Sequence, residues 1–193
     1  FGHPRGLGVL FFVEFWERFS YYGMRAMLIF YMYFAIQDHG LGIDKTTAMS
    51  IMSVYGALIY MSSIPGGWIA DRITGTRGAT LIGAVLIILG HICLSLPFAM
   101  FGLFASMFFI IIGSGLMKPN ISNIVGRLYP ENDVRMDAGF VIFYMSVNFG
   151  ALISPIILQH FINVKNFHGG FLIAAIGMAL GLVWYVLFNR KNL

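Results

Sequence analysis

The chain has 193 residues, of which 59% are hydrophobic and 10% are charged, and its mean hydropathy is +0.82. A soluble globular domain carries about 25% charged residues, so this composition indicates an integral membrane protein. The formal net charge of +4 comes without a basic run or an aromatic stacking platform, so no nucleic-acid partner is expected.

Six apolar stretches follow one another along the chain, each bounded by glycine, proline, asparagine or charge. A helix needs about 20 residues to cross a hydrocarbon core of roughly 30 Å. We therefore predict one all-α membrane domain with six transmembrane helices and short connections. The predicted spans are about 7–36, 47–71, 77–96, 99–127, 138–160 and 170–188. Six helices could contain a three-plus-three inverted repeat, although such repeats leave only weak sequence symmetry.

The cations between the predicted spans are unevenly distributed. If the N-terminus is cytoplasmic, the outer loops hold only Lys45 and Lys165, whereas the inner segments hold seven cations. Because cytoplasmic loops of membrane proteins carry the excess of Lys and Arg, both ends of this chain are expected in the cytoplasm. The inner cations are Arg5, Arg72, Arg77, Arg127, Arg135, Arg190 and Lys191.

The first predicted span contains the segment EFWERFSYYGMR, which places four charges between apolar flanks. On a helix, Glu14, Glu17, Arg18, Tyr21 and Arg25 form one narrow polar stripe. Glu14 precedes Arg18 by four residues, so the two side chains can pair. Each charge at membrane depth costs roughly 2.5–3.5 kcal/mol on insertion scales, and pairing offsets only part of that cost. We interpret the stripe as lining a water-filled path rather than as a self-neutralised ion cluster.

The fourth predicted span contains Lys118 in the segment GSGLMKPNIS. Pro119 removes an amide donor and is expected to bend the helix, so the ammonium can point into a central cavity. The alternative is that Lys118 extends to the cytoplasmic interface. Asn120 and Ser122 are expected to hydrogen-bond carbonyl groups near the bend in either case.

The fifth predicted span contains FYMSVNFG, with Tyr144 and Asn148 at i and i+4 on one face. A buried amide in a membrane helix is as compatible with helix packing as with ligand contact, and Tyr60 in the second span is equally ambiguous. Tyr21 and Tyr22 stand between charges in mid-span, which favours cavity lining over an interfacial position.

Other chemistry has little support. GSGLMK lacks the third glycine of a dinucleotide fingerprint, and no phosphate-loop motif occurs. The five histidines show no metal-ligand spacing, and no serine has a histidine and an acid arranged for catalysis. We therefore expect no metal, no cofactor and no enzymatic activity. His91, a lone histidine in an apolar run, is expected to be a hydrogen-bonded structural residue.

Four segments together resemble a known family. EFWERFSYYG resembles the ExxERFxYYG motif in the first helix of the proton-dependent oligopeptide transporters, a branch of the major facilitator superfamily. GGWIADRITGTR at 66–77 resembles that superfamily's loop between helices two and three. GLMKPNIS and FYMSVNFG resemble the family's fourth-helix and fifth-helix motifs. The four segments occur in the expected order between residues 14 and 150.

The resemblance implies proton-coupled symport of di- and tripeptides by alternating access across the plasma membrane, with protons as the coupling ion. The implied proton-coupling residues are Glu14, Glu17, Arg18 and Lys118. The implied peptide-binding residues are Tyr21, Tyr22, Arg25, Tyr60, Lys118 and Asn148. Asp71 and Arg72 match a cytoplasmic pair that controls gating and does not contact substrate.

The residue types suit a peptide ligand. Arg25 can bind a carboxylate in a bidentate fork, and Lys118 can bind it as a point charge. Tyrosines offer apolar faces with polar tips, which tolerate varied side chains. A carboxylate that shares a cation with the substrate site can couple proton binding to peptide binding.

The resemblance also exposes a departure, because the family has at least twelve spans and this chain contains six. We interpret residues 1–193 as the N-terminal six-helix bundle of a bacterial transporter. Its expected partners are peptides, protons, the lipid bilayer and a C-terminal six-helix bundle of the same protein. Two alternatives remain: a self-contained oligomeric six-helix channel, and a non-transporting membrane receptor.

Overall fold

The computed structural model describes residues 2–192, with side chains for residues 2–189, and in this part of the chain it is helical without β-strands. Its α-helices are α1 (Arg5–Tyr33), α2 (Lys45–Met61), α3 (Ser63–Ile69), α4 (Gly75–Ser95), α5 (Ala99–Arg127), α6 (Met136–Asn163) and α7 (Phe167–Asn192). A 3-10 turn, η1 (Ile36–Asp38), and a π-helical segment, η2 (Ala70–Thr74), complete the order. The side chains of Arg190 and Lys191, two of the predicted inner cations, lie outside the described part.

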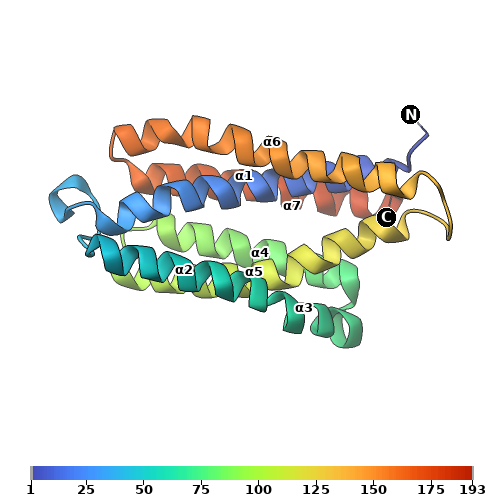
Figure 1. Ribbon diagram of the computed structural model, residues 1–193, viewed down its shortest axis with the longest axis horizontal. Helices are drawn as coiled ribbons and strands as arrows, with labels where there is room; N and C mark the ends of the chain where they lie inside the picture. Colours follow the sequence, from blue (N-terminus) through green and yellow to red (C-terminus); the bar gives the residue numbers. More distant parts are fainter. Residues whose placement is uncertain (1, 193) are drawn as a thin grey trace.

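The helices run back and forth along one axis, and both chain ends lie at the same end of the bundle (Figure 1). Among the described residues, four helical segments are long and apolar enough to cross a membrane. They are Lys45–Ser95, Ala99–Arg127, Met136–Asn163 and Phe167–Asn189. α1 carries the charged stripe and is not one of the four, so the prediction of six spans remains a prediction.

The second predicted span, about 47–71, corresponds in the structure to α2, a single turn residue at Ser62, α3 and the start of η2. α2 begins after Asp44, whose carboxylate accepts hydrogen bonds from two backbone amides of the first turn. It ends before Ser62, whose hydroxyl oxygen lies 2.8 Å from the carbonyl oxygen of Ile59 and 2.8 Å from that of Ile111 on α5. Helix then continues through α3 and η2, and the chain reverses at Gly75, where φ is +72°.

Glycines bring two pairs of helices into close contact. A Cβ added at Gly83 of α4 would lie 2.6 Å from the carbonyl oxygen of Gly113 on α5. A Cβ added at Gly66 of α3 would lie 2.0 Å from the carbonyl oxygen of Gly115. Any side chain would push these backbones apart, so the small residues serve helix packing.

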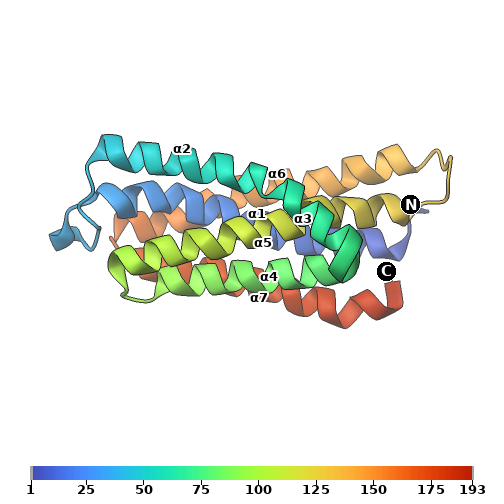
Figure 2. The same ribbon diagram turned by 90° about the horizontal axis from the view of Figure 1, so that it is seen from below.

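The helix contacts form a regular pattern. α1 packs on α6 and α7, α5 packs on α2, α3 and α4, and α4 packs on α7. The pattern of contacts is unchanged when α1 is exchanged with α5, α2 and α3 with α6, and α4 with α7. A three-plus-three repeat requires this symmetry. Figure 1 shows the α1 and α6 pair above the α2 and α5 pair, and Figure 2 shows α4 and α7 side by side on the edge of the bundle opposite to α2.

Candidate functional site

The centre of α1 holds a buried charged cluster of Glu14, Glu17 and Arg18. The Arg18 Nε lies 3.0 Å from Glu14 Oε1, and the same nitrogen pairs with the carboxylate of Glu17. The three residues are only 6%, 1% and 5% exposed. The predicted pairing of Glu14 with Arg18 is confirmed, and the cluster combines two carboxylates with one guanidinium.

Lys118 of α5 lies beside this cluster between two aromatic rings. Its Nζ is 5.0 Å from the ring centroid of Tyr21 on α1 and 5.0 Å from that of Tyr60 on α2. The Arg18 guanidinium carbon lies 5.3 Å from the centroid of the same Tyr21 ring. The ammonium therefore points among three helices and does not extend along α5 toward its end.

Two features of α5 place Lys118 in this position. Pro119 lies inside the helix, and α5 changes direction along its length in Figure 1. The buried Asn120 side chain donates to the Leu116 carbonyl at 2.6 Å, while Ser122 donates to the Lys118 carbonyl at 3.4 Å. Both polar side chains therefore hydrogen-bond the backbone around the proline, as predicted.

Arg25 extends the polar stripe toward a groove between α1 and α2. Its guanidinium donates to the Tyr21 hydroxyl at 3.1 Å. It also borders a cavity of about 340 Å³, together with Ile29, Met49, Met52 and Ser53. The Tyr22 ring lies 5.2 Å from the Tyr21 ring. Arg25 is itself exposed, so its remaining donors are open to a ligand.

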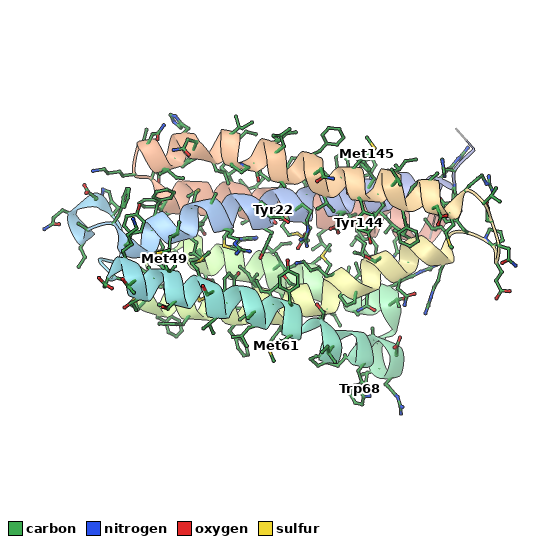
Figure 3. All side chains as sticks on the ribbon, viewed as in Figure 1. Tyr22, Met49, Met61, Trp68, Tyr144 and Met145 are labelled. Atoms are coloured by element: carbon green, nitrogen blue, oxygen red, sulfur yellow. The ribbon has the colours of Figure 1, made fainter. Side chains whose placement is uncertain are left out.

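The residues on α6 lie apart from these contacts. Tyr144 is 52% exposed, and the exposed Asn148 side chain donates to the Tyr144 carbonyl of its own helix at 3.1 Å. Figure 3 shows Tyr144 on the side of α6 that faces α5, with its neighbour Met145 on the opposite side. Among the described residues, Asn148 makes no hydrogen bond to another helix, so it does not join helices here.

Asp71 and Arg72 lie in η2, at the bundle end where both termini are found (Figure 1). Both are exposed, and within residues 2–189 neither takes part in a salt bridge. The structure thus brings the charged cluster, Tyr21, Arg25, Tyr60 and Lys118 together and keeps the predicted gating pair separate from them.

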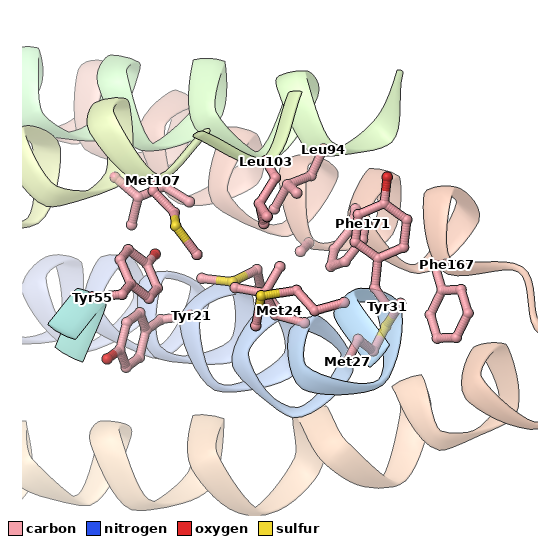
Figure 4. Packing of buried hydrophobic residues seen from close by; sticks show 14 of the residues in the cluster. Tyr21, Met24, Met27, Tyr31, Tyr55, Leu94, Leu103, Met107, Phe167 and Phe171 are labelled. Atoms are coloured by element: carbon pink, nitrogen blue, oxygen red, sulfur yellow. The ribbon is translucent and has the colours of Figure 1, made fainter. Parts of the chain in front are cut away.

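Tyr55 on α2 was not among the predicted site residues. This tyrosine is 3% exposed, packs beside Tyr21 in the apolar cluster of Figure 4, and its hydroxyl has no hydrogen-bond partner among the described residues. Its position on the helix gave no signal, because Tyr55 and Tyr60 do not share a helical face.

The prediction for His91 was wrong. This histidine is fully buried on α4, and neither ring nitrogen has a hydrogen-bond partner among the described residues. The apolar interior between the helices provides no polar group for the imidazole. Among all the residues that the structure describes, no group of three or more His, Cys, Asp or Glu side chains is arranged to hold a metal ion.

A bundle of apolar helices with a buried ion cluster and an aromatic-flanked lysine defines a helical membrane protein with an internal polar site. A family model described as POT family matches residues 78–191, which is more than half of the chain. The chain therefore belongs to the POT family.

Relatives match over the full chain, including the charged helix. The chain is 53% identical over 193 residues to the "Uncharacterized transporter YclF" of Bacillus subtilis (strain 168), covering 100% of this chain and 39% of that protein. It is 52% identical over 189 residues to a "Di-/tripeptide transporter" of Lactococcus lactis subsp. lactis (strain IL1403), covering 96% of this chain and 38% of that protein.

A solved structure is also closely similar. A POT family transporter crystallised in complex with a thioalcohol conjugated peptide is 91% identical to the chain, with a TM-score of 0.99. The match covers 100% of this chain and 39% of the crystallised one. The chain thus spans about two fifths of the length of the proteins that it matches.

Proposed function

We propose that the chain is the N-terminal half of a proton-coupled symporter of di- and tripeptides that works by alternating access. The observation that carries the proposal is the buried ion cluster on α1 with Lys118 beside it. Placing such a cluster in a membrane costs free energy, and a water-filled transport path would explain why the charges are there. The names of the relatives support peptides as the transported class.

Arg25 and Lys118 are the proposed partners of the peptide's C-terminal carboxylate. Arg25 borders the groove between α1 and α2, and Lys118 lies half-buried between two rings. Tyr21, Tyr22, Tyr60 and Asn148 would form the surrounding walls. Tyrosine rings bind varied side chains through their apolar faces, which suits a transporter of many peptides.

Charge balance gives a physical reason for proton coupling. Glu14 and Glu17 compete for the single guanidinium of Arg18, so Lys118 is the nearby cation that can balance the second carboxylate. When one carboxylate takes up a proton, Lys118 loses this role and becomes available to the peptide carboxylate. Proton binding and peptide binding then favour the same state of the site.

The rest of the protein would complete the cavity. Tyr60 and Tyr144 are 67% and 52% exposed, and a C-terminal six-helix bundle would face them. We place both ends of this segment in the cytoplasm of a cell whose plasma membrane holds the protein. Asp71 and Arg72 would then lie on the cytoplasmic side, where gating contacts between the halves are expected.

The test uses the full-length transporter in liposomes with a labelled dipeptide. An inward acid gradient should concentrate the peptide, and Glu17→Gln should abolish this uptake while counterflow exchange persists. Glu131→Gln, an exposed acid between α5 and α6, should behave as the wild type. Uptake that ignores the gradient would exclude proton coupling.

The same experiment separates the alternatives. An oligomeric channel would equilibrate the peptide without concentrating it, and a receptor would bind it without uptake. Loss of both gradient-driven uptake and counterflow in Glu17→Gln, with normal folding, would contradict a role restricted to the proton.

A further inference from the structure

A second polar cavity lies at the end of the bundle opposite to the chain termini. Its volume is about 180 Å³, and we call it the loop-end pocket. It is lined by Tyr31, His39, Gly40, Leu41, Pro97, Ala99 and His168. Tyr31 follows Arg18 by 13 residues, so the pocket is about 20 Å along α1 from the charged cluster. It is therefore a separate site.

The orientation of His168 leaves one ring nitrogen available to a ligand. Its Nδ1 lies 2.8 Å from the carbonyl oxygen of Leu94 at the end of α4. A carbonyl can only accept a hydrogen bond, so Nδ1 carries the hydrogen and the neutral ring keeps a lone pair on Nε2. Metal-bound histidines are typically held in this way by their second nitrogen.

Two contacts hold the segment that carries His39 against the start of α7. Asp38, the neighbour of His39, forms an ion pair with Lys165, three residues before His168. The Phe34 ring packs on the Phe167 ring with centroids 5.6 Å apart. Both histidines therefore border one small pocket because their segments are tied together on each side.

Tyr31 supplies a third polar group. It is 3% exposed, it lies between Phe167 and Phe171 in Figure 4, and its ring meets the His168 ring edge-on at 5.5 Å. Among the described residues its hydroxyl makes no hydrogen bond, and this oxygen is not one of the buried polar atoms without a partner, so it is accessible from the pocket. A water bound to an ion in the pocket would give this hydroxyl a partner.

We propose that the loop-end pocket binds a divalent transition-metal ion such as Zn²⁺, with His39 and Nε2 of His168 as its protein ligands. Imidazole suits zinc, copper and nickel, whereas Mg²⁺ and Ca²⁺ prefer oxygen ligands, and no carboxylate lines the pocket. The volume lies below the roughly 300 Å³ at which drug-sized ligand sites begin, so an ion with its waters fits better.

The coordination would be incomplete without solvent. Structural zinc sites have four protein ligands and catalytic ones have three, so a site with two histidines binds an exchangeable ion whose shell water completes. The ion would join η1 to α7 across the loop end of the bundle. This proposal does not depend on the transported substrate, because its readout is metal binding alone.

The test is calorimetric titration of the purified full-length transporter, stripped with a chelator, with ZnCl₂. We expect one saturable site, about tenfold or greater loss of affinity in both His39→Gln and His168→Gln, and no binding of MgCl₂. His160→Gln replaces an exposed histidine of α6 that does not line the pocket, and it should bind zinc as the wild type does.

Several results would overturn the proposal. These are an absence of saturable zinc binding in the wild type, loss of affinity in only one of the two variants, and an equal loss in His160→Gln. A rise in the thermal unfolding temperature with inorganic phosphate but not with zinc would assign the pocket to an anion instead. If His168→Gln fails to fold, the His39→Gln variant decides alone, and zinc affinity equal to that of the wild type would overturn the proposal. His39 is exposed, so its replacement is expected to leave the fold intact.

Discussion

Gly150 of α6 lies directly against Arg18 of α1. A Cβ added at Gly150 would come within 2.8 Å of the Arg18 Cβ and within 2.8 Å of the Phe15 carbonyl oxygen. The glycine that ends FYMSVNFG thus meets the charged turn of EFWERFSYYG, so two motifs that are far apart in the chain share one contact. α6 covers the ion cluster here.

We expect Gly150→Ala to destabilise the protein by about 1–3 kcal/mol, because the added methyl group meets backbone atoms that cannot rotate away. Thermal unfolding of the full-length protein would measure the change. Gly67→Ala is the matched control, since a Cβ there meets no atom within 4 Å. Similar unfolding temperatures for both variants would contradict the close contact.

Arg25→Ala should weaken the binding of peptides with a free C-terminal carboxylate by about tenfold or more, because a charge-assisted hydrogen bond contributes roughly 1.5–3 kcal/mol. Amidated peptides should lose much less affinity. Equilibrium binding of each peptide pair provides the measurement. Lys45→Ala removes an exposed cation at the start of α2 and should change neither affinity. Equal losses for acid and amide would refute the assignment.

Tyr60→Leu should weaken peptide binding about two- to fivefold, because removal of the ring leaves Lys118 with one aromatic neighbour and an exposed cation–π contact contributes about 0.5–1 kcal/mol. Tyr60→Phe keeps the ring and should bind nearly as well as the wild type. A loss as large in Tyr60→Phe would show that the hydroxyl matters and the ring does not.

His91→Leu should stabilise the protein, or leave its stability unchanged, although it removes a buried polar residue. An imidazole without partners carries a desolvation cost of about 1–3 kcal/mol, which an apolar side chain of similar size avoids. Chemical and thermal unfolding would test this. A clear loss of stability would mean that His91 has a partner in the folded protein after all.

The connection between α5 and α6 should show a measurable acid dependence. Arg135 donates to both carboxylate oxygens of Asp133, at 3.0 and 2.7 Å, and also to the carbonyl of Gly2. The hydrogen bonds from Arg135 to the Asp133 carboxylate lower the pKa of Asp133 from 3.8 to about 2. Because the pKa is lower in the folded protein, the ionised Asp133 stabilises the fold at pH values above its ordinary pKa of 3.8. This contribution is lost as the pH falls through about 2.

The measurement compares the unfolding temperatures of Asp133→Asn and the wild type across that range. Their difference should be constant between about pH 5 and 7 and should shrink only below about pH 4. Glu131→Gln, at an exposed acid of the same connection that forms no salt bridge among the described residues, is the matched control. If the unfolding temperatures of Asp133→Asn and the wild type are already equal at pH 4, the lowered pKa of Asp133 is contradicted.

Local patterns in the sequence were sufficient for much of this protein. Hydrophobic stretches predicted an all-α membrane protein, since burial of the backbone in helices is what a bilayer requires. The spacing of Glu14 and Arg18 predicted their ion pair, because residues four apart meet on any helix. The motif segments indicated the family for the same reason: each is contiguous and readable on its own.

Only the tertiary structure decided which distant residues meet. Lys118 lies between Tyr21 and Tyr60, and Gly150 meets Arg18, through the packing of different helices. Ser62, between α2 and α3, contacts the Ile111 carbonyl on α5, and His91 is buried where the described residues offer its ring no hydrogen-bond partner. These contacts are set by how ridges, grooves and small residues fit between helices, which no local period encodes.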